Sequence, residues 1–174
     1  MSMKRGRNFL LSPGPTNIPD RVLRAMQRPA IALHSDELVG LARSCLDDLK
    51  PIFRTREGET FIYAANGHGA WEAALSNSLS PGDHNLGVET GVFGEAWAGM
   101  GKHLGLVPEF IPGDWRHGID AQALEDRLRA DTNHTFKAVL MVQTDTATGI
   151  TSDVAAARQA IDNAGHPALF MVDA

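Results

Sequence analysis

Short apolar runs alternate with amphipathic stretches from residue 60 onward. The apolar runs predict strands, and stretches in which apolar residues recur every three or four positions predict helices. The expected strands are 60–65, 84–89, 107–111, 138–143 and 168–172; the expected helices are 70–79, 95–104, one capped by Asp120 and reaching Arg129, and one capped by Asp153 and reaching Ala164. Almost wholly apolar strands separated by helices indicate a mostly parallel sheet covered on both faces, a three-layer αβα sandwich of the α/β class.

The first part of the chain has a different pattern. Residues 1–19 carry little periodicity, and the prolines of 12–19 favour extended geometry, so we expect an N-terminal arm or loop. Apolar spacing then predicts a helix from Asp20, as its cap, to about Gln27 and a longer one from about Ser35 to Phe53. We therefore divide the chain into an arm, 1–19, and the first part of one large α/β domain, 20–174.

Composition limits the classes of function. The 43% apolar and 21% charged residues are ordinary for a soluble globular protein. A net charge of −5 without a Lys/Arg cluster argues against a nucleic-acid partner. No stretch approaches the roughly 18 apolar residues of a membrane span. The seven histidines show no ligand spacing with cysteines or acids, so we expect no metal site.

The single cysteine, Cys45, bears on the compartment and on chemistry. It cannot form an internal disulfide, which fits a reducing cytoplasm. Leu41, Leu46 and Leu49 surround it at helical spacing, so we expect a buried apolar thiol and not a nucleophile.

The candidate site residues follow the expected strands directly. Ligands of parallel α/β sheets bind beyond the carboxyl ends of the strands. The segments there are Asn66-Gly67-His68, Glu89-Thr90-Gly91-Val92-Phe93-Gly94, Thr144-Asp145-Thr146-Ala147-Thr148-Gly149 and Asp173. In the first, a glycine-flanked turn before a helix leaves backbone N–H groups free at the positive end of the helix dipole, which predicts a phosphate site.

A flat, phosphorylated ring that contains nitrogen would use all four segments. Its phosphate would bind at Gly67 and His68, and Phe93 would stack on its face. Asp173 would accept a hydrogen bond from a protonated ring nitrogen, and Thr146 would contact the ring's edge. Two structural alternatives stay open: Asp173 could cap a following helix, and Phe93 could be a core residue of the next helix. Trp71 is expected in the core.

The motifs resemble those of a known enzyme family. The chain is similar to the front part of class V (fold type I) pyridoxal-phosphate-dependent aminotransferases, of the alanine–glyoxylate and serine–glyoxylate group. The stretches that carry the resemblance span nearly the whole chain: Ser12-Pro13-Gly14-Pro15-Thr16-Asn17-Ile18-Pro19, Asn66-Gly67-His68-Gly69-Ala70-Trp71-Glu72-Ala73-Ala74-Leu75, Ser80-Pro81-Gly82-Asp83, Glu89-Thr90-Gly91-Val92-Phe93-Gly94, Thr146-Ala147-Thr148-Gly149 and Val172-Asp173-Ala174.

The resemblance implies a cofactor, pyridoxal 5′-phosphate, and a role for each site residue. Asn66, Gly67 and His68 would hold the phosphate, Phe93 would stack on the pyridine, Thr146 would touch its edge and Asp173 would pair with its nitrogen. Relatives often have Ser or Thr in place of Asn66 and Trp in place of Phe93. The resemblance also implies a homodimer, in which Pro13-Gly14-Pro15 packs on the partner subunit. The substrates would be a small amino acid, serine or alanine, and a 2-oxo acid such as glyoxylate or pyruvate.

The family's chemistry also needs a lysine that forms a Schiff base with the cofactor, in a Ser-x-x-Lys stretch after the aspartate. None of Lys4, Lys50, Lys102 and Lys137 stands in that context. We therefore expect no catalytic residue within this chain, and expect the lysine and the arginine that binds the substrate carboxylate to lie beyond Ala174. We expect the chain to be an incomplete piece of a longer enzyme that cannot transaminate by itself.

Three alternatives remain. The front half is shared with 2-aminoethylphosphonate–pyruvate and pyridoxamine–pyruvate aminotransferases. A nucleotide-binding domain has a similar topology, although this chain lacks Gly-x-Gly-x-x-Gly after its first strand. A non-catalytic α/β interaction domain is the third, because a fold does not fix a function.

Overall fold

The computed structural model describes residue 6, residues 9–11 and residues 14–174. Contacts divide the chain into two compact units, Met1–Ile62 and Tyr63–Ala174. Ser12 and Pro13 of the expected arm motif lie outside the described residues. The boundary after residue 19 stays a prediction.

The first unit holds α1 (Asp20–Met26) and α2 (Asp36–Ile52). Ser35 caps α2 by accepting the N–H of Leu38 at 3.2 Å. Asp20 is the first residue of α1, not its cap. No residue of either helix is buried, and Cys45 is exposed, so the expectation of a buried thiol is wrong for this chain. Helical spacing shows that a helix has an apolar face, but it does not show what covers that face.

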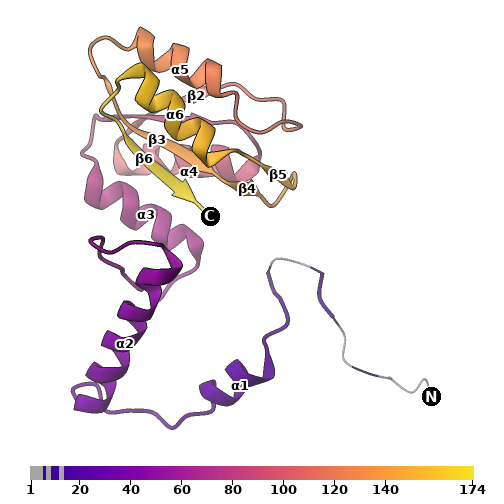
Figure 1. The fold of residues 1–174 in the computed structure, drawn as a ribbon, viewed down its shortest axis with the longest axis vertical. Coiled ribbons are helices and arrows are strands. Elements are labelled where there is room, and N and C mark those ends of the chain that lie inside the picture. The colour runs from indigo at the N-terminus through magenta and orange to yellow at the C-terminus, as the bar shows by residue number, and fades with distance from the viewer. Residues whose placement is uncertain (1–5, 7–8, 12–13) are drawn as a thin grey trace. The chain divides into compact units, whose positions relative to one another are not determined.

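The second unit is built on a parallel sheet of β1 (His84–Val88), β2 (Val107–Ile111), β3 (Phe136–Val142) and β6 (Leu169–Asp173). The strand order is β2-β1-β3-β6, and every pair is parallel. Figure 1 labels β2, β3 and β6 of this sheet. These strands confirm the predicted sheet, with ends that shift by up to two residues. Asp173 is the last residue of its strand and does not follow it.

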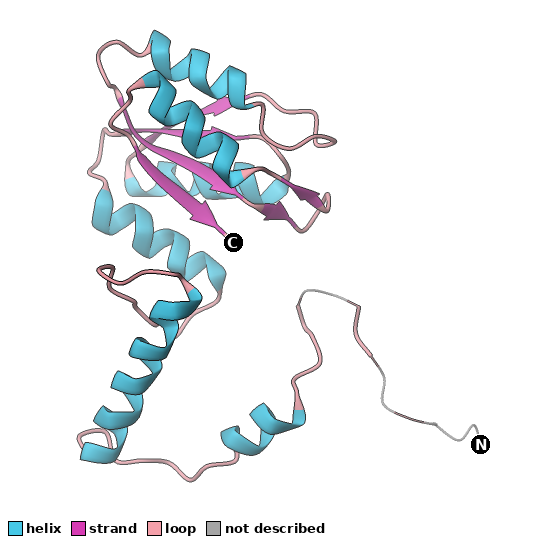
Figure 2. Ribbon diagram, in the orientation of Figure 1, coloured by secondary structure: helices cyan, strands magenta, loops and turns pink. Residues whose placement is uncertain are grey.

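Helices cover both faces of this sheet. α5 (Ala121–Ala130) and α6 (Val154–Ala164) lie on one face, and α4 (Val92–Met100) lies on the other (Figure 2). α3 (Gly67–Ser78) and a 3₁₀ turn, η1 (Gly101–Leu104), complete this unit. Asp120 and Asp153 cap α5 and α6, as predicted. No helix in the described part is long and apolar enough to cross a bilayer.

The core has two halves, one on each face of the sheet. Val139 and Met141 of β3 belong to the half that contains α5 and α6, whereas Leu140 and Val142 pack with Trp71 and Trp97 of α3 and α4. This alternation follows from the period of two along a strand. It makes β3 the buried centre of the unit.

One predicted strand is not found, and one pair of strands was not predicted. Residues 60–65 form no strand, and Phe61, Ile62 and Tyr63 are all more than half exposed. An apolar run can form a strand only where another strand accepts its hydrogen bonds, and no pairing involves this run among the described residues. A small antiparallel pair that was not predicted, β4 (Thr144–Asp145) with β5 (Ile150–Thr151), follows β3.

Candidate functional site

The residues predicted to bind the cofactor all lie in the second unit, and three of them lie where its parallel strands end. Phe93 is the second residue of α4, after β1; Thr146 lies in the turn between β4 and β5, after β3; and Asp173 ends β6. Asn66, Gly67 and His68 form the start of α3. We call the carboxyl ends of the strands, together with the start of α3 and the segments that hold Phe93 and Thr146, the carboxyl edge.

The start of α3 offers backbone donors to solvent. Asn66 is the extended N-cap, and its side chain caps nothing. The N–H of Gly69 donates to the Asn66 carbonyl at 3.0 Å, but those of Gly67 and His68 have no acceptor among the described residues. A Cβ at Gly69 would overlap with the Cβ of Ala65, so the turn requires glycine there. Free donors at a helix N-terminus fit an anion such as phosphate.

An aromatic row joins this turn to α4. The rings of His68 and Trp71 lie 4.6 Å apart between centroids, and the ring of Phe93 meets Trp71 edge-on at 6.2 Å. Trp71 also stacks on Trp97 at 5.7 Å and is buried, which confirms its predicted place in the core. Phe93 is half-buried and packs against the same core half. Trp71 therefore links the predicted phosphate site to the predicted stacking ring.

Thr146 and Asp173 line one hollow. It has a volume of about 240 Å³, and Gln143, Thr144 and Ala174 complete its lining. The N–H of Gln143 donates to the Asp173 carbonyl at 2.8 Å, which fixes the end of β6 against the segment after β3. The half-buried Asp173 carboxylate has no hydrogen-bond or ion-pair partner within the described part of the chain. A carboxylate that lines this hollow is thus free to accept a hydrogen bond from a cationic donor.

Asp145 connects the two groups of residues, and its role was not predicted. Its side chain is fully buried. Its Oδ2 accepts the N–H groups of Phe93 at 2.8 Å and Gly94 at 3.2 Å, while its Oδ1 accepts that of Ala147 at 3.0 Å. The Asp145 carboxylate therefore joins the first turn of α4 to the turn that carries Thr146. Only its place shortly after a predicted strand marks it in the sequence, because Phe93 and Gly94 lie about fifty residues away from it.

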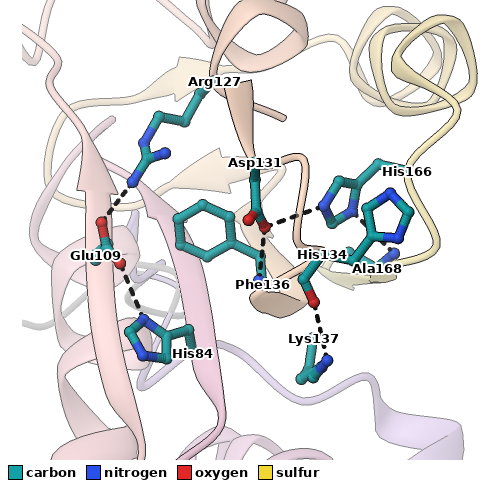
Figure 3. A network of polar contacts seen from close by, with 9 residues as sticks. All are labelled: His84, Glu109, Arg127, Asp131, His134, Phe136, Lys137, His166 and Ala168. Atoms are coloured by element: carbon teal, nitrogen blue, oxygen red, sulfur yellow. Dashed lines mark hydrogen bonds and ion pairs between the residues drawn. The ribbon is translucent and has the colours of Figure 1, made fainter. Parts of the chain in front are cut away.

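At the opposite, amino edge of the sheet, polar side chains bind one another and nearby backbone groups (Figure 3). The Nδ1 of His166 accepts the N–H of Ala168 at 3.2 Å, so its Nε2 carries the proton and donates to Oδ2 of Asp131 at 3.2 Å. The same oxygen accepts the N–H of Phe136 at 2.8 Å. Lys137 donates to the His134 carbonyl at 2.9 Å, at the end of the sheet away from the predicted site.

The hydrogen bonds of this network set the charge of Asp131. Burial raises the pKa of its carboxyl, but the N–H groups of Phe136 and Thr135, the Thr135 hydroxyl and His166 outweigh that and hold the pKa well below its usual range. Asp131 therefore stays ionised, and its hydrogen-bond partners are all groups of the protein itself.

A second hollow, of about 410 Å³, lies at the ends of β1 and β2 and contains Glu89, Asp114, His117 and Asp120. Its acids have partners: Asp114 accepts the N–H groups of Arg116 and His117, and its Oδ2 lies 2.8 Å from Nδ1 of His117. These bonds lower the pKa of Asp114 to about 2, the N–H of Arg116 most. No group of three potential metal ligands occurs in the described part of the chain.

Comparison with known proteins gives this geometry a context. No family model matches the chain. It is 46% identical to serine–glyoxylate aminotransferase of Methylorubrum extorquens and 38% identical to L-aspartate–glyoxylate aminotransferase of Paracoccus denitrificans. These matches cover 97% and 96% of the chain, and 42% of each relative. Among solved structures, alanine–glyoxylate aminotransferase of Nostoc sp. has a TM-score of 0.86 at 23% identity, covering 99% of this chain and 45% of its own, which shows a common fold.

The matches bear on both the identity and the extent of the chain. Identities of 38% to 46% extend over 96% to 97% of the chain. The chain spans less than half the length of these relatives. Over almost all of its own length, the chain is homologous to serine–glyoxylate and L-aspartate–glyoxylate aminotransferases.

Proposed function

We propose that the protein transfers an amino group between a small amino acid and glyoxylate with pyridoxal 5′-phosphate as its cofactor. One observation carries the proposal above all. The carboxyl edge gathers free N–H donors, a half-buried aromatic ring, a hydroxyl and an unpartnered carboxylate in a chain homologous to enzymes with this activity.

The residues present fit this cofactor in charge and chemistry. The N–H groups of Gly67 and His68, with the side chains of Asn66 and His68, would hold the phosphate dianion. Phe93 would stack on the pyridine, and Thr146 would contact its edge. The Asp173 carboxylate would keep a proton on the ring nitrogen, which keeps the bound ring an electron sink for the amino acid's α-carbon.

We expect the lysine that bonds covalently to the cofactor to lie outside residues 1–174. Lys50 forms an ion pair with Glu59 at 3.1 Å, and Lys137 binds the His134 carbonyl. Lys102 lies in η1. None of these three lies among the residues of the carboxyl edge. This chain would therefore supply cofactor binding and not the covalent step.

The substrate proposal follows the matched relatives. Both curated relatives named above are glyoxylate aminotransferases, one for serine and one for aspartate. We propose glyoxylate as acceptor, and serine or alanine as donor. Pyruvate in place of glyoxylate, as in pyridoxamine–pyruvate aminotransferases, is the competing acceptor.

A homodimer in the cytoplasm is proposed for the assembly and its location. Apolar side chains of the first unit, such as Leu23, Met26 and Phe53, are exposed in the single chain and would be covered by another surface. The exposed, unpaired thiol of Cys45 fits a reducing compartment.

The test is performed on the intact protein with added pyridoxal 5′-phosphate. We expect visible absorbance that borohydride bleaches, and conversion of serine and glyoxylate into hydroxypyruvate and glycine. Aspartate, alanine and pyruvate, tested in turn, identify the preferred donor and acceptor. A protein that neither gains visible absorbance nor transfers the amino group would contradict the proposal. A nicotinamide-binding domain or an interaction module would give that negative result.

A further inference from the structure

Asp145 is a buried polar residue at the carboxyl edge, and none of the proposed cofactor contacts gives it a role. Its side chain is 0% exposed, so it cannot touch a ligand in the hollow beside it. Both carboxylate oxygens are nevertheless used: Oδ2 by the N–H groups of Phe93 and Gly94, and Oδ1 by that of Ala147. A fully buried carboxylate needs such donors because its burial is otherwise costly.

The two segments that Asp145 joins carry two of the proposed ligand contacts. Phe93 itself donates to Oδ2, and Thr146 lies between Asp145 and Ala147, the residue that donates to Oδ1. The hydroxyl of Thr148 adds a second tie across the same gap by donating to the Thr90 carbonyl at 3.3 Å. The turn after β3 and the start of α4 are thereby held in one arrangement.

Gly91 provides the space for this carboxylate. A Cβ built at Gly91 would overlap with Cγ and both oxygens of Asp145. Any other residue at this position would have to displace the carboxylate or the turn before α4. The position of the Asp145 carboxylate therefore depends on glycine at position 91.

We infer that Asp145 is a positioning residue, which sets where the Phe93 ring stands relative to the Thr146 hydroxyl. The inference rests on the proposed function, because it assigns Asp145 to the same cofactor site. Asparagine cannot replace it fully. Its single oxygen can serve either the α4 turn or the Ala147 N–H, and its NH₂ group would face a donor at the other.

The experiment uses the intact protein and pyridoxine 5′-phosphate, which lacks the aldehyde and so reports binding without a covalent bond. Affinity is measured by calorimetry for the unchanged protein, for Asp145→Asn and for Gly91→Ala. The circular dichroism of bound pyridoxal 5′-phosphate reports how the ring is held. Asp131→Asn is the matched control, because Asp131 is also a buried aspartate that accepts a backbone N–H, but at the amino edge.

We expect Asp145→Asn to bind the probe about three- to tenfold more weakly, the range that a lost aromatic stack predicts. The cofactor's dichroic band should shrink, and Gly91→Ala should change both readouts in the same direction. Asp131→Asn should lower Tm and leave affinity and dichroism unchanged. Far-UV circular dichroism verifies that each variant is folded; if Asp145→Asn is not, Gly91→Ala decides by the same criteria.

The inference is overturned if folded Asp145→Asn loses Tm as the control does but keeps affinity and dichroism. Asp145 would then be structural only. If the unchanged protein binds neither pyridoxine 5′-phosphate nor pyridoxal 5′-phosphate, the proposed function itself is wrong, and the inference with it. The two failures are therefore distinct.

Discussion

At the amino edge of the sheet, where β1, β3 and β6 begin, the buried side chains of Asp131 and His166 bind each other. At the carboxyl edge, where the strands end, several polar groups have no partner in the described part of the chain. Asp131 and His166 are 9% and 6% exposed, and both are hydrogen-bonded (Figure 3). By contrast, the carboxylate of Asp173 and the N–H groups of Gly67 and His68 have no partner among the described residues.

This difference separates stability from function. A polar group that is hydrogen-bonded inside the protein stabilises the fold, whereas a group without a protein partner is a place where a ligand can add a hydrogen bond. The two buried aspartates show the contrast most directly. Asp131 fastens the start of β3 to the segment before β6, while Asp145 fastens two loops that carry proposed ligand contacts.

The largest expected effect is at the amino edge. Asp131→Ala leaves the N–H of Phe136 and the Nε2–H of His166 without an acceptor in a buried place, so we expect the free energy of unfolding to fall by about 3 kcal/mol. Urea unfolding measures it. Asp153→Ala, which removes the exposed cap of α6, is the control, with an expected loss of about 1 kcal/mol. A loss at Asp131 no larger than at the control would remove the distinction between the edges.

The next effect is at the carboxyl edge and concerns binding. Asp173→Asn should weaken pyridoxal 5′-phosphate binding, because a neutral amide cannot hold a proton on the ring nitrogen. A hydrogen bond to a charged group contributes about 1.5–3 kcal/mol, so we expect the affinity to fall by about ten- to a hundredfold. Tm without cofactor should hardly change, since the carboxylate has no partner to lose within the described part. Calorimetric titration measures the affinity, with Asp153→Asn as control. Unchanged affinity would argue against Asp173 as a ligand.

The pH dependence of stability sharpens the view of the amino edge. The pKa of Asp131 is lowered in the fold from an ordinary value of 3.8. Its contribution is therefore complete above that value and is lost as pH falls through the lowered pKa. We expect the difference in unfolding free energy between the unchanged protein and Asp131→Asn to shrink as pH falls below about 4. Urea unfolding from pH 6 to pH 2.5 measures it, and a constant difference would contradict the assignment.

The smallest expected loss of stability is at Glu109, a partly exposed residue beside the amino edge. Glu109 accepts from Arg127 and lies 3.0 Å from Nδ1 of His84, a contact that lowers the pKa of Glu109 more than any other partner does. Because these side chains are 30–40% exposed, solvent screens the ion pairs, and Glu109→Gln should cost less than about 1 kcal/mol of stability. Thermal unfolding measures it. A loss as large as that of Asp131→Ala would show that this group belongs to the buried network.

Much of the second unit can be predicted from local signals. The caps Asp120 and Asp153 fix the starts of α5 and α6, because an aspartate before a helix accepts the first free N–H groups. The apolar runs of β1, β2, β3 and β6 predict buried parallel strands. The order of loops along the chain then gives the carboxyl edge, since all parallel strands end on one side.

The predictions that fail depend on partners distant in sequence. Residues 60–65 have the composition of a strand, but none of the described strands pairs with them. Cys45 has apolar neighbours at helical spacing but is exposed. The pairing of β4 with β5 is only two residues long on each side, too short for a periodic signal. Asp145 bonds to residues about fifty positions away, so no local pattern marks its role.

Hydrogen exchange of the intact protein, with and without saturating pyridoxal 5′-phosphate, tests most directly whether the carboxyl edge is the ligand site and the amino edge is structural. We predict slower exchange with the cofactor in 66–70, 91–95 and 144–149, and no change in 131–137 and 165–169. Protection confined to the amino edge, or to residues 112–120 of the hollow beyond β2, would contradict the account.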